Sequence, residues 1–151
     1  MKFELKKLLY NYCESFLKRK LTNYQNQKKE LFESLESETK SSAGDKHETG
    51  RAMIQLEIEK LGNQIREAEK EHTFLKKNNN KIISSNIQIG TIVKTKKNIF
   101  YVMISAGIFK YKSKKIYCIS QKSPIGALLI GKKVNDNFIF NNEKIEILNI
   151  I

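Results

Sequence analysis

The chain has 151 residues and a formal net charge of +12, and its basic residues are lysines apart from three arginines. A chain of this length holds one domain or two small ones, which excludes a large catalytic core. A positive field of this size attracts nucleic acid or an acidic protein surface and speeds the encounter with either.

The cysteines and the apolar runs bear on the cellular compartment. Cys13 and Cys118 fall in segments that belong to different predicted domains, so we expect reduced thiols rather than a disulfide framework. No apolar run approaches the roughly 18 to 20 residues that span a bilayer, and charges interrupt the N-terminal apolar residues too often for a signal peptide. We therefore expect a cytoplasmic protein that makes no contact with a membrane.

Two series of mostly apolar residues recur in alternating steps of four and three. The first comprises Leu17, Leu21, Tyr24, Lys28, Leu31 and Leu35, within residues 3–38, which lack glycine and proline. The second comprises Ile54, Ile58, Leu61, Ile65, Ala68, His72 and Leu75. This spacing is typical of a two-stranded coiled-coil seam. Because only a short stretch separates the two series, both helices are predicted to form one antiparallel hairpin.

The predicted hairpin covers residues 1–78 and has its tip at residues 43–50. A hairpin closed within one chain predicts a monomer, and a structural or oligomerising coiled coil is the alternative that the heptads leave open. His72 occupies a seam position, which we interpret as a packed side chain rather than a ligand. The polar segment KKNNNK at residues 76–81 lacks periodicity and predicts a linker.

The pattern of residues 82–151 predicts a small sheet with one short helix. Runs rich in Ile, Val, Tyr and Phe, bounded by turn residues, indicate five or six short strands. These runs are TIVKT, IFYVMI, IFKYK, KIYCIS, FIF and KIEILNII. Between the fourth and fifth runs, Ser123 suits a helix N-cap, Pro124 a first turn and Gly131 a C-cap. The predicted fold class is therefore α+β, a helical hairpin followed by an antiparallel sheet with one helix.

The sequence offers little support for a catalytic site of the chain's own. Cys118 lacks a base, because the two histidines, His47 and His72, belong to the hairpin. The glycines are scattered singly, so there is no glycine-rich phosphate loop of the Walker or dinucleotide type, and the ligands for a zinc site are missing. Direct RNA binding by the lysine-rich sheet stays open as an alternative, although its aromatic residues show no ribonucleoprotein signature.

The predicted tip carries two acidic residues, Asp45 and Glu48, three positions apart. If the second helix begins near Gly44 or Asp45, both carboxylates project from one side of its first turn. Helix capping accounts for such a pair, with Asp45 as the N-cap and Glu48 at the third helical position. Two carboxylates at an exposed end also suit a Mg²⁺ ion whose remaining ligands come from a partner. The spacing leaves both interpretations open.

The chain as a whole resembles the Gre family of bacterial transcript cleavage factors, which join an N-terminal antiparallel coiled coil to a C-terminal FKBP-like domain. IQIGTIVKT at residues 87–95 resembles the strand that opens this C-terminal domain. ISQKSPIGALLIGKKVNDNF at residues 119–138 resembles the family's Ser-Pro-Ile, Leu-Leu-Gly-Lys and Gly-Asp signature. GDKHE at residues 44–48 has the Gly-Asp-x-x-Glu spacing of the family's acidic loop.

The resemblance implies an FKBP-like domain over residues 82–151 and a role as a transcription elongation factor. Such a factor is not itself an enzyme: its hairpin enters the secondary channel of core RNA polymerase and brings the tip close to the RNA 3′ end. Asp45 and Glu48 would then be the catalytic, metal-coordinating pair that helps to hold a second Mg²⁺ while the polymerase cuts backtracked RNA. The alternative is a non-cleaving secondary-channel regulator or a coiled-coil interaction module without a catalytic role.

Overall fold

The computed structural model describes residues 2–40, 44–80 and 84–151, and within these ranges it leaves the side chains of residues 39, 40 and 44–47 undescribed. The chain divides into two compact units. One is Leu17–His72, and the other combines Met1–Phe16 with Thr73–Ile151. The predicted domain boundary between residues 78 and 82 lies beside undescribed residues and stays a prediction.

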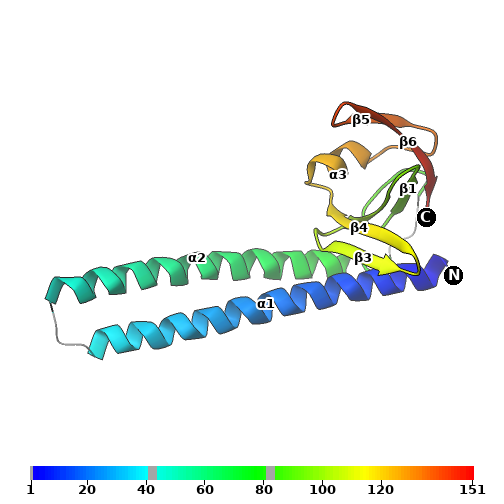
Figure 1. The fold of residues 1–151 in the computed structure, drawn as a ribbon. Helices are drawn as coiled ribbons and strands as arrows, with labels where there is room; N and C mark the ends of the chain where they lie inside the picture. Colours follow the sequence, from blue (N-terminus) through cyan, green and yellow to red (C-terminus); the bar gives the residue numbers. More distant parts are fainter. Residues whose placement is uncertain (1, 41–43, 81–83) are drawn as a thin grey trace. The chain divides into compact units, whose positions relative to one another are not determined.

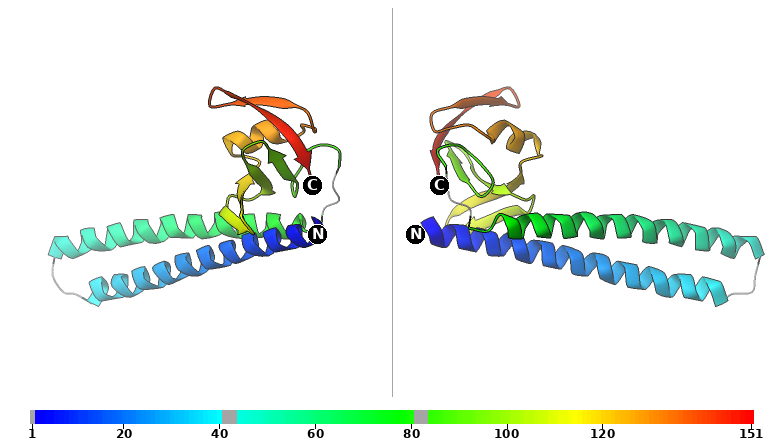
Figure 2. Two further views of the ribbon diagram at one scale, coloured as in Figure 1. Left: turned by 45° about the vertical axis from the view of Figure 1, so that its right-hand side comes forward. Right: turned by 180° about the vertical axis from the view of Figure 1, so that it is seen from behind.

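Two long helices form the predicted hairpin. Helix α1 (Lys2–Lys40) and helix α2 (Gly44–Lys77) run side by side in opposite directions, as Figure 1 and Figure 2 show. They contain 39 and 34 residues. In the parts of the chain that are described, no helix combines the length and the apolar character that a membrane span requires.

The two predicted seam series face the interior of the hairpin. Within Leu17–His72, the side chains of Leu17, Leu61 and Ala68 are buried, and the other predicted seam residues are half-buried, whereas most residues between them are exposed. Across the seam, Lys20 Nζ lies 3.6 Å from Glu71 Oε1. The spacing of four and three therefore identified the contact surface of both helices correctly.

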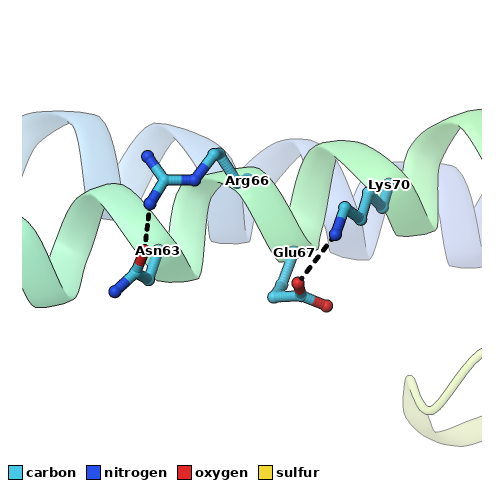
Figure 3. A network of polar contacts seen from close by, with 4 residues as sticks. All are labelled: Asn63, Arg66, Glu67 and Lys70. Carbon is cyan, nitrogen blue, oxygen red and sulfur yellow. Dashed lines mark hydrogen bonds and ion pairs between the residues drawn. The ribbon is translucent and has the colours of Figure 1, made fainter.

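Polar pairs on α2 add to the hairpin's surface. Arg66 donates a hydrogen bond to Asn63 Oδ1, and Lys70 Nζ lies 3.2 Å from Glu67 Oε1, and the partners are three positions apart in each case (Figure 3). Exposed pairs of this spacing stabilise a helix by about 0.2–0.5 kcal/mol each. The buried seam consequently contributes far more to the stability of the hairpin than these contacts do.

A sheet of six strands accounts for every predicted run. The strands are β1 (Ile92–Thr95), β2 (Ile99–Met103), β3 (Gly107–Tyr111), β4 (Lys114–Ser120), β5 (Asn137–Phe140) and β6 (Glu143–Ile150). Their order across the sheet is β3-β4-β2-β1-β6-β5. One pair departs from the predicted antiparallel sheet, because β2 and β4 are parallel, with Ile99 opposite Ile116. Strand β3 lies at the edge of the sheet and pairs antiparallel with β4. Strand β4 therefore lies between β3 and β2 and runs parallel to β2.

A close backbone approach fixes the short helix α3 (Pro124–Leu129), which contacts β4 and β5. The Ser123 hydroxyl accepts a hydrogen bond from the Gly126 amide at 3.2 Å and donates one to the Ser120 carbonyl at 2.6 Å. A Cβ atom at residue 126 would lie 2.0 Å from that carbonyl oxygen, so only glycine fits. The helix ends at the cap residue Ile130, and the predicted cap Gly131 follows with φ of +84°.

The first turns of α1 pack on the sheet within one compact unit. The Tyr12 hydroxyl donates to the Ala106 carbonyl at 2.8 Å and lies 3.1 Å from the Ile108 carbonyl. Cys13 is fully buried and shares a hydrogen bond with the buried Cys118 thiol of β4. The expectation that the two cysteines belong to separate parts of the chain is therefore wrong, although both are free thiols. This hydrogen bond is the larger cause, and burial the smaller one, of a pKa of Cys13 that lies well above its ordinary value.

We expect Gly126→Ala to lower the free energy of unfolding by about 1–3 kcal/mol, because the added methyl group overlaps the Ser120 carbonyl. Urea unfolding followed by circular dichroism measures the change. Gly62→Ala is the matched control, since its Cβ would meet only Arg66 Nη1, at 3.7 Å, and alanine favours a helix interior by about 0.5–1 kcal/mol. Equal effects of the two substitutions would contradict the close approach at Gly126.

We expect the thiols of Cys13 and Cys118 to react with a disulfide reagent only as the chain unfolds. The thiolate is the reactive form, and burial and the raised pKa of Cys13 suppress it. At pH 7 the rate in native protein should be at least about 100-fold below the rate in urea. The variant Cys118→Ala reports on Cys13 alone, and rapid modification of that variant in its native state would show that Cys13 is not buried as described.

Candidate functional site

The candidate site is the tip of the hairpin, where α1 ends at Lys40 and α2 begins at Gly44 (Figure 1). This start confirms the prediction that the second helix begins near Gly44 or Asp45. Asp45 is consequently the second residue of α2 rather than the cap residue that precedes it. The pair therefore does not occupy the positions that the predicted capping box requires. Residues 41–43, which would supply the cap, lie outside the described part of the chain.

Both predicted site residues belong to the first two turns of α2. Their three-residue spacing in a helix places Asp45 and Glu48 on the same side of it. Glu48 is exposed to solvent, whereas the side chain of Asp45 is outside the described set. Their proposed roles as catalytic residues and metal ligands stay predictions.

A third acidic residue near the tip was missed by the sequence analysis. The half-buried carboxylate of Glu38, in the last turns of α1, faces Gly50 of α2. A Cβ atom at residue 50 would lie 3.5 Å from Glu38 Oε2, so the glycine lets the carboxylate come close to the α2 backbone. The signal was present in the sequence, because Glu38 continues the steps of Leu31 and Leu35 by three residues. It was overlooked because a seam series is normally followed through apolar residues.

Basic residues flank the acidic pair. Arg51 is exposed one turn beyond Glu48. Lys46 and His47 lie between the two acids in the sequence, and their side chains are outside the described set. Positive groups within a few ångströms of a carboxylate favour its ionised form, and they also compete with a metal ion for it.

The donor set at the tip is too small for a metal site of its own. Among the residues with described side chains, no three His, Cys, Asp or Glu residues come together in a way that would hold a metal ion. Mg²⁺ prefers six oxygen ligands in octahedral geometry, and two carboxylates supply a minority of them. Oxygen donors from Asp45 and Glu48 fit the chemistry of Mg²⁺, and water or a partner would have to supply the other ligands.

His72 lies in the seam, as its position in the second series predicted. Its ring is half-buried, and its Nε2 atom is buried without a hydrogen-bond partner in the described portion of the structure. A buried nitrogen without a partner is costly. We therefore regard His72 as a packing residue that the seam tolerates, and we assign it no chemical role.

Comparisons with known proteins give little beyond this geometry. No protein-family model matches the chain, and no curated protein is significantly similar to it. The solved structure of the transcription factor Gfh1 is similar with a TM-score of 0.36 and 18% sequence identity, over 91% of this chain and 92% of that chain. A similarity of this quality does not place the chain in a family.

We expect Glu48→Gln to change the free energy of unfolding by no more than about 0.5 kcal/mol, because Glu48 is exposed and lies beyond the seam. Thermal unfolding of the full chain measures this. Leu61→Ala is the contrasting variant, because it empties a buried seam position and should cost about 2–5 kcal/mol. A large loss of stability in Glu48→Gln would mean that Glu48 holds the tip together rather than being available to a partner.

Proposed function

We propose that the chain is a Gre-like accessory factor of bacterial RNA polymerase. In this proposal the hairpin enters the secondary channel of the core enzyme, and Asp45 and Glu48 complete the shell of a second Mg²⁺ ion close to the RNA 3′ end. The bound ion would help the polymerase to hydrolyse backtracked RNA by activating water or by stabilising the leaving oxygen. The chain itself supplies the two carboxylates and their position, and the polymerase supplies the remaining ligands.

The observation that carries the proposal is the acidic pair in the first two turns of α2, at the end where the hairpin turns back. Glu48 is exposed there and is thus available to a partner. The carboxylates alone are insufficient for a stable Mg²⁺ site. An incomplete set of hard oxygen donors at an exposed tip is what a factor needs if it is to complete another protein's metal site.

The dimensions of the hairpin agree with insertion into a channel. At a rise of about 1.5 Å per residue, the 34 residues of α2 extend about 50 Å. Two packed helices with their side chains measure about 20 Å across. The seam is internal to the chain, so the outer faces of the hairpin, which carry most of its charged residues, are left for contacts with a partner.

The signature in residues 119–138 supports the fold that this proposal requires, not the activity itself. Ser123 is the N-cap of α3 and Pro124 lies in its first turn, as the capping preferences of these residues predicted. The surplus of positive charge favours association with the negatively charged surfaces and nucleic acid of a transcription complex.

A specific feature favours a second candidate function, that of a channel-binding regulator that does not stimulate cleavage. Lys46, His47 and Arg51 replace residues that are small, apolar or acidic in the Gre family, and they surround the acidic pair in the sequence. Their positive charges would weaken the hold of the carboxylates on Mg²⁺. The two candidates share the binding step and differ in the chemistry at the tip.

We expect the full chain to bind its cognate core polymerase at low micromolar concentration and low salt, and to accelerate RNA shortening in stalled, backtracked complexes. Asp45→Asn and Glu48→Gln should each reduce this acceleration by about 10²-fold or more, since each removes a charged metal ligand at nearly constant shape. The RNA lengths are resolved on a denaturing gel over time, and binding is measured separately by fluorescence anisotropy.

Glu57→Gln is the matched control, because Glu57 is an exposed acid on α2 outside the tip. It should leave both binding and cleavage unchanged. Binding without any acceleration of cleavage by the wild-type chain would establish the regulator instead. Absence of binding to the polymerase would refute both candidates, and equal cleavage by all four proteins would leave the acidic pair without a catalytic role.

A further inference from the structure

A cavity of about 730 Å³ lies within one compact unit, beside the first turns of α1. One wall is a single face of that helix, formed by Lys2, Phe3, Lys6, Lys7 and Tyr10. The other walls come from the turn after α2 and from the sheet at Gly90, Tyr101 and Met103. Its volume falls in the range of cavities that hold cofactors and other small molecules.

The charged side chains that line this cavity are all positive. Three lysines line it, and none of the described side chains around it is acidic. Lys2 and Lys6 are four residues apart on one helix face, an arrangement of like charges that destabilises a helix. The cavity therefore concentrates positively charged side chains.

Lys6 is the most informative of the three. It is half-buried, and burial lowers its pKa from the ordinary value of 10.5 to about 8. No carboxylate pairs with it in the ranges that the structure describes. A lysine that is partly removed from water without an acidic partner costs stability, and ionisable groups with perturbed pKa values cluster at functional sites. An anionic ligand would supply the missing partner.

The same cavity offers an aromatic surface. The side chain of Phe3 is 76% exposed, whereas phenylalanine side chains are usually buried. Behind it the wall is apolar, formed in part by the buried Met103 and Tyr101. Burial raises the pKa of Tyr101, so its phenol stays neutral and adds no negative charge that would repel an anion.

We propose that this cavity binds a nucleotide, with its phosphates held by Lys2, Lys6 and Lys7 and its base against the ring of Phe3. Phosphate groups suit a cluster of lysine ammonium groups, and a planar base suits an exposed aromatic face. Inorganic phosphate alone would use only the lysines and leave the aromatic face and most of the volume unfilled. The site is separate from Asp45 and Glu48, and it stands whether or not the tip acts in RNA cleavage.

The test is titration of the full-length chain with ATP, pyrophosphate and adenosine, followed by isothermal calorimetry. We expect ATP to bind at least about 10-fold more tightly than either fragment, because only ATP uses both surfaces. Lys6→Gln should weaken ATP binding about 10-fold through loss of one charge-assisted contact, and Phe3→Ala should remove the advantage of ATP over pyrophosphate. Lys144→Gln, which removes an exposed lysine outside the cavity, should change the affinity less than about 2-fold.

The pH dependence separates Lys6 from the other charges. With the pKa of Lys6 at about 8, its protonated fraction falls about 10-fold between pH 7 and pH 9, and the affinity for ATP should fall with it. Lys2, Lys7, Tyr10 and Tyr101 also face the cavity, so the comparison with Lys6→Gln is essential. That variant should lack the Lys6 contribution and show a correspondingly smaller fall over this pH range.

Folding of the Lys6→Gln variant is checked separately. The folded-state pKa of Lys6 lies below the unfolded value, so its charge is destabilising below pH 8, and this cost disappears as the pH rises above about 10.5. The variant should therefore unfold no earlier than wild type at pH 7. Absence of ATP binding would overturn the proposal, as would equal binding of ATP and pyrophosphate. Tighter binding of a short RNA than of ATP, with the same dependence on Lys6, would assign the site to nucleic acid and would also overturn it.

Discussion

Burial of the two seam series against each other is the constraint on which the hairpin depends. A helix in water gains little from its own hydrogen bonds, so α1 and α2 have to cover each other's apolar faces in order to persist. The seam is not uniform, since Lys28 and His72 interrupt it. Nevertheless, the remaining positions keep the spacing of four and three on both helices, so a regular contact surface persists up to the tip. The outer faces of the hairpin therefore contribute little to its folding.

The tip is the place where this constraint ends. Glu38 is the last described seam residue of α1, and it faces Gly50 rather than an apolar side chain. A carboxylate in this position contributes little hydrophobic stabilisation, so the hairpin is held less firmly here than at Leu17 or Leu61. Looser packing at this end allows local adjustment of the two helices.

Periodicity explains how much of the fold could be predicted from the sequence. The seam of both helices and all six strands follow from local spacing, because burial of one face imposes it on each element separately. The parallel pairing of β2 with β4 and the contact between Cys13 and Cys118 could not be predicted in this way. Both depend on which distant segments meet, and no local pattern carries that information.

The two candidate sites, at the tip and around Lys6, differ in the same way: one follows from local sequence and the other depends on distant segments. Asp45 and Glu48 could be found because they are close in the sequence and stand at a break in a regular pattern. The surroundings of Lys6 could not, because its partial burial arises from a sheet that begins more than 80 residues later. In the sequence Lys6 is one lysine among many. Its distinctive property, a charge without a partner, exists only after folding.

The contact between Gly126 and the Ser120 carbonyl affects how a sequence resemblance should be weighed. Ser123 caps α3, Pro124 starts it, and Gly126 is the residue that can pass the β4 backbone at this distance. Any chain that turns from a strand into a helix by this route is under the same steric demand, whatever it binds. The Ser-Pro-Ile-Gly motif in this sequence is thus explained by the fold alone. Evidence about activity has to come from residues that the fold does not require. At the tip these are Asp45, Glu48 and the basic residues beside them.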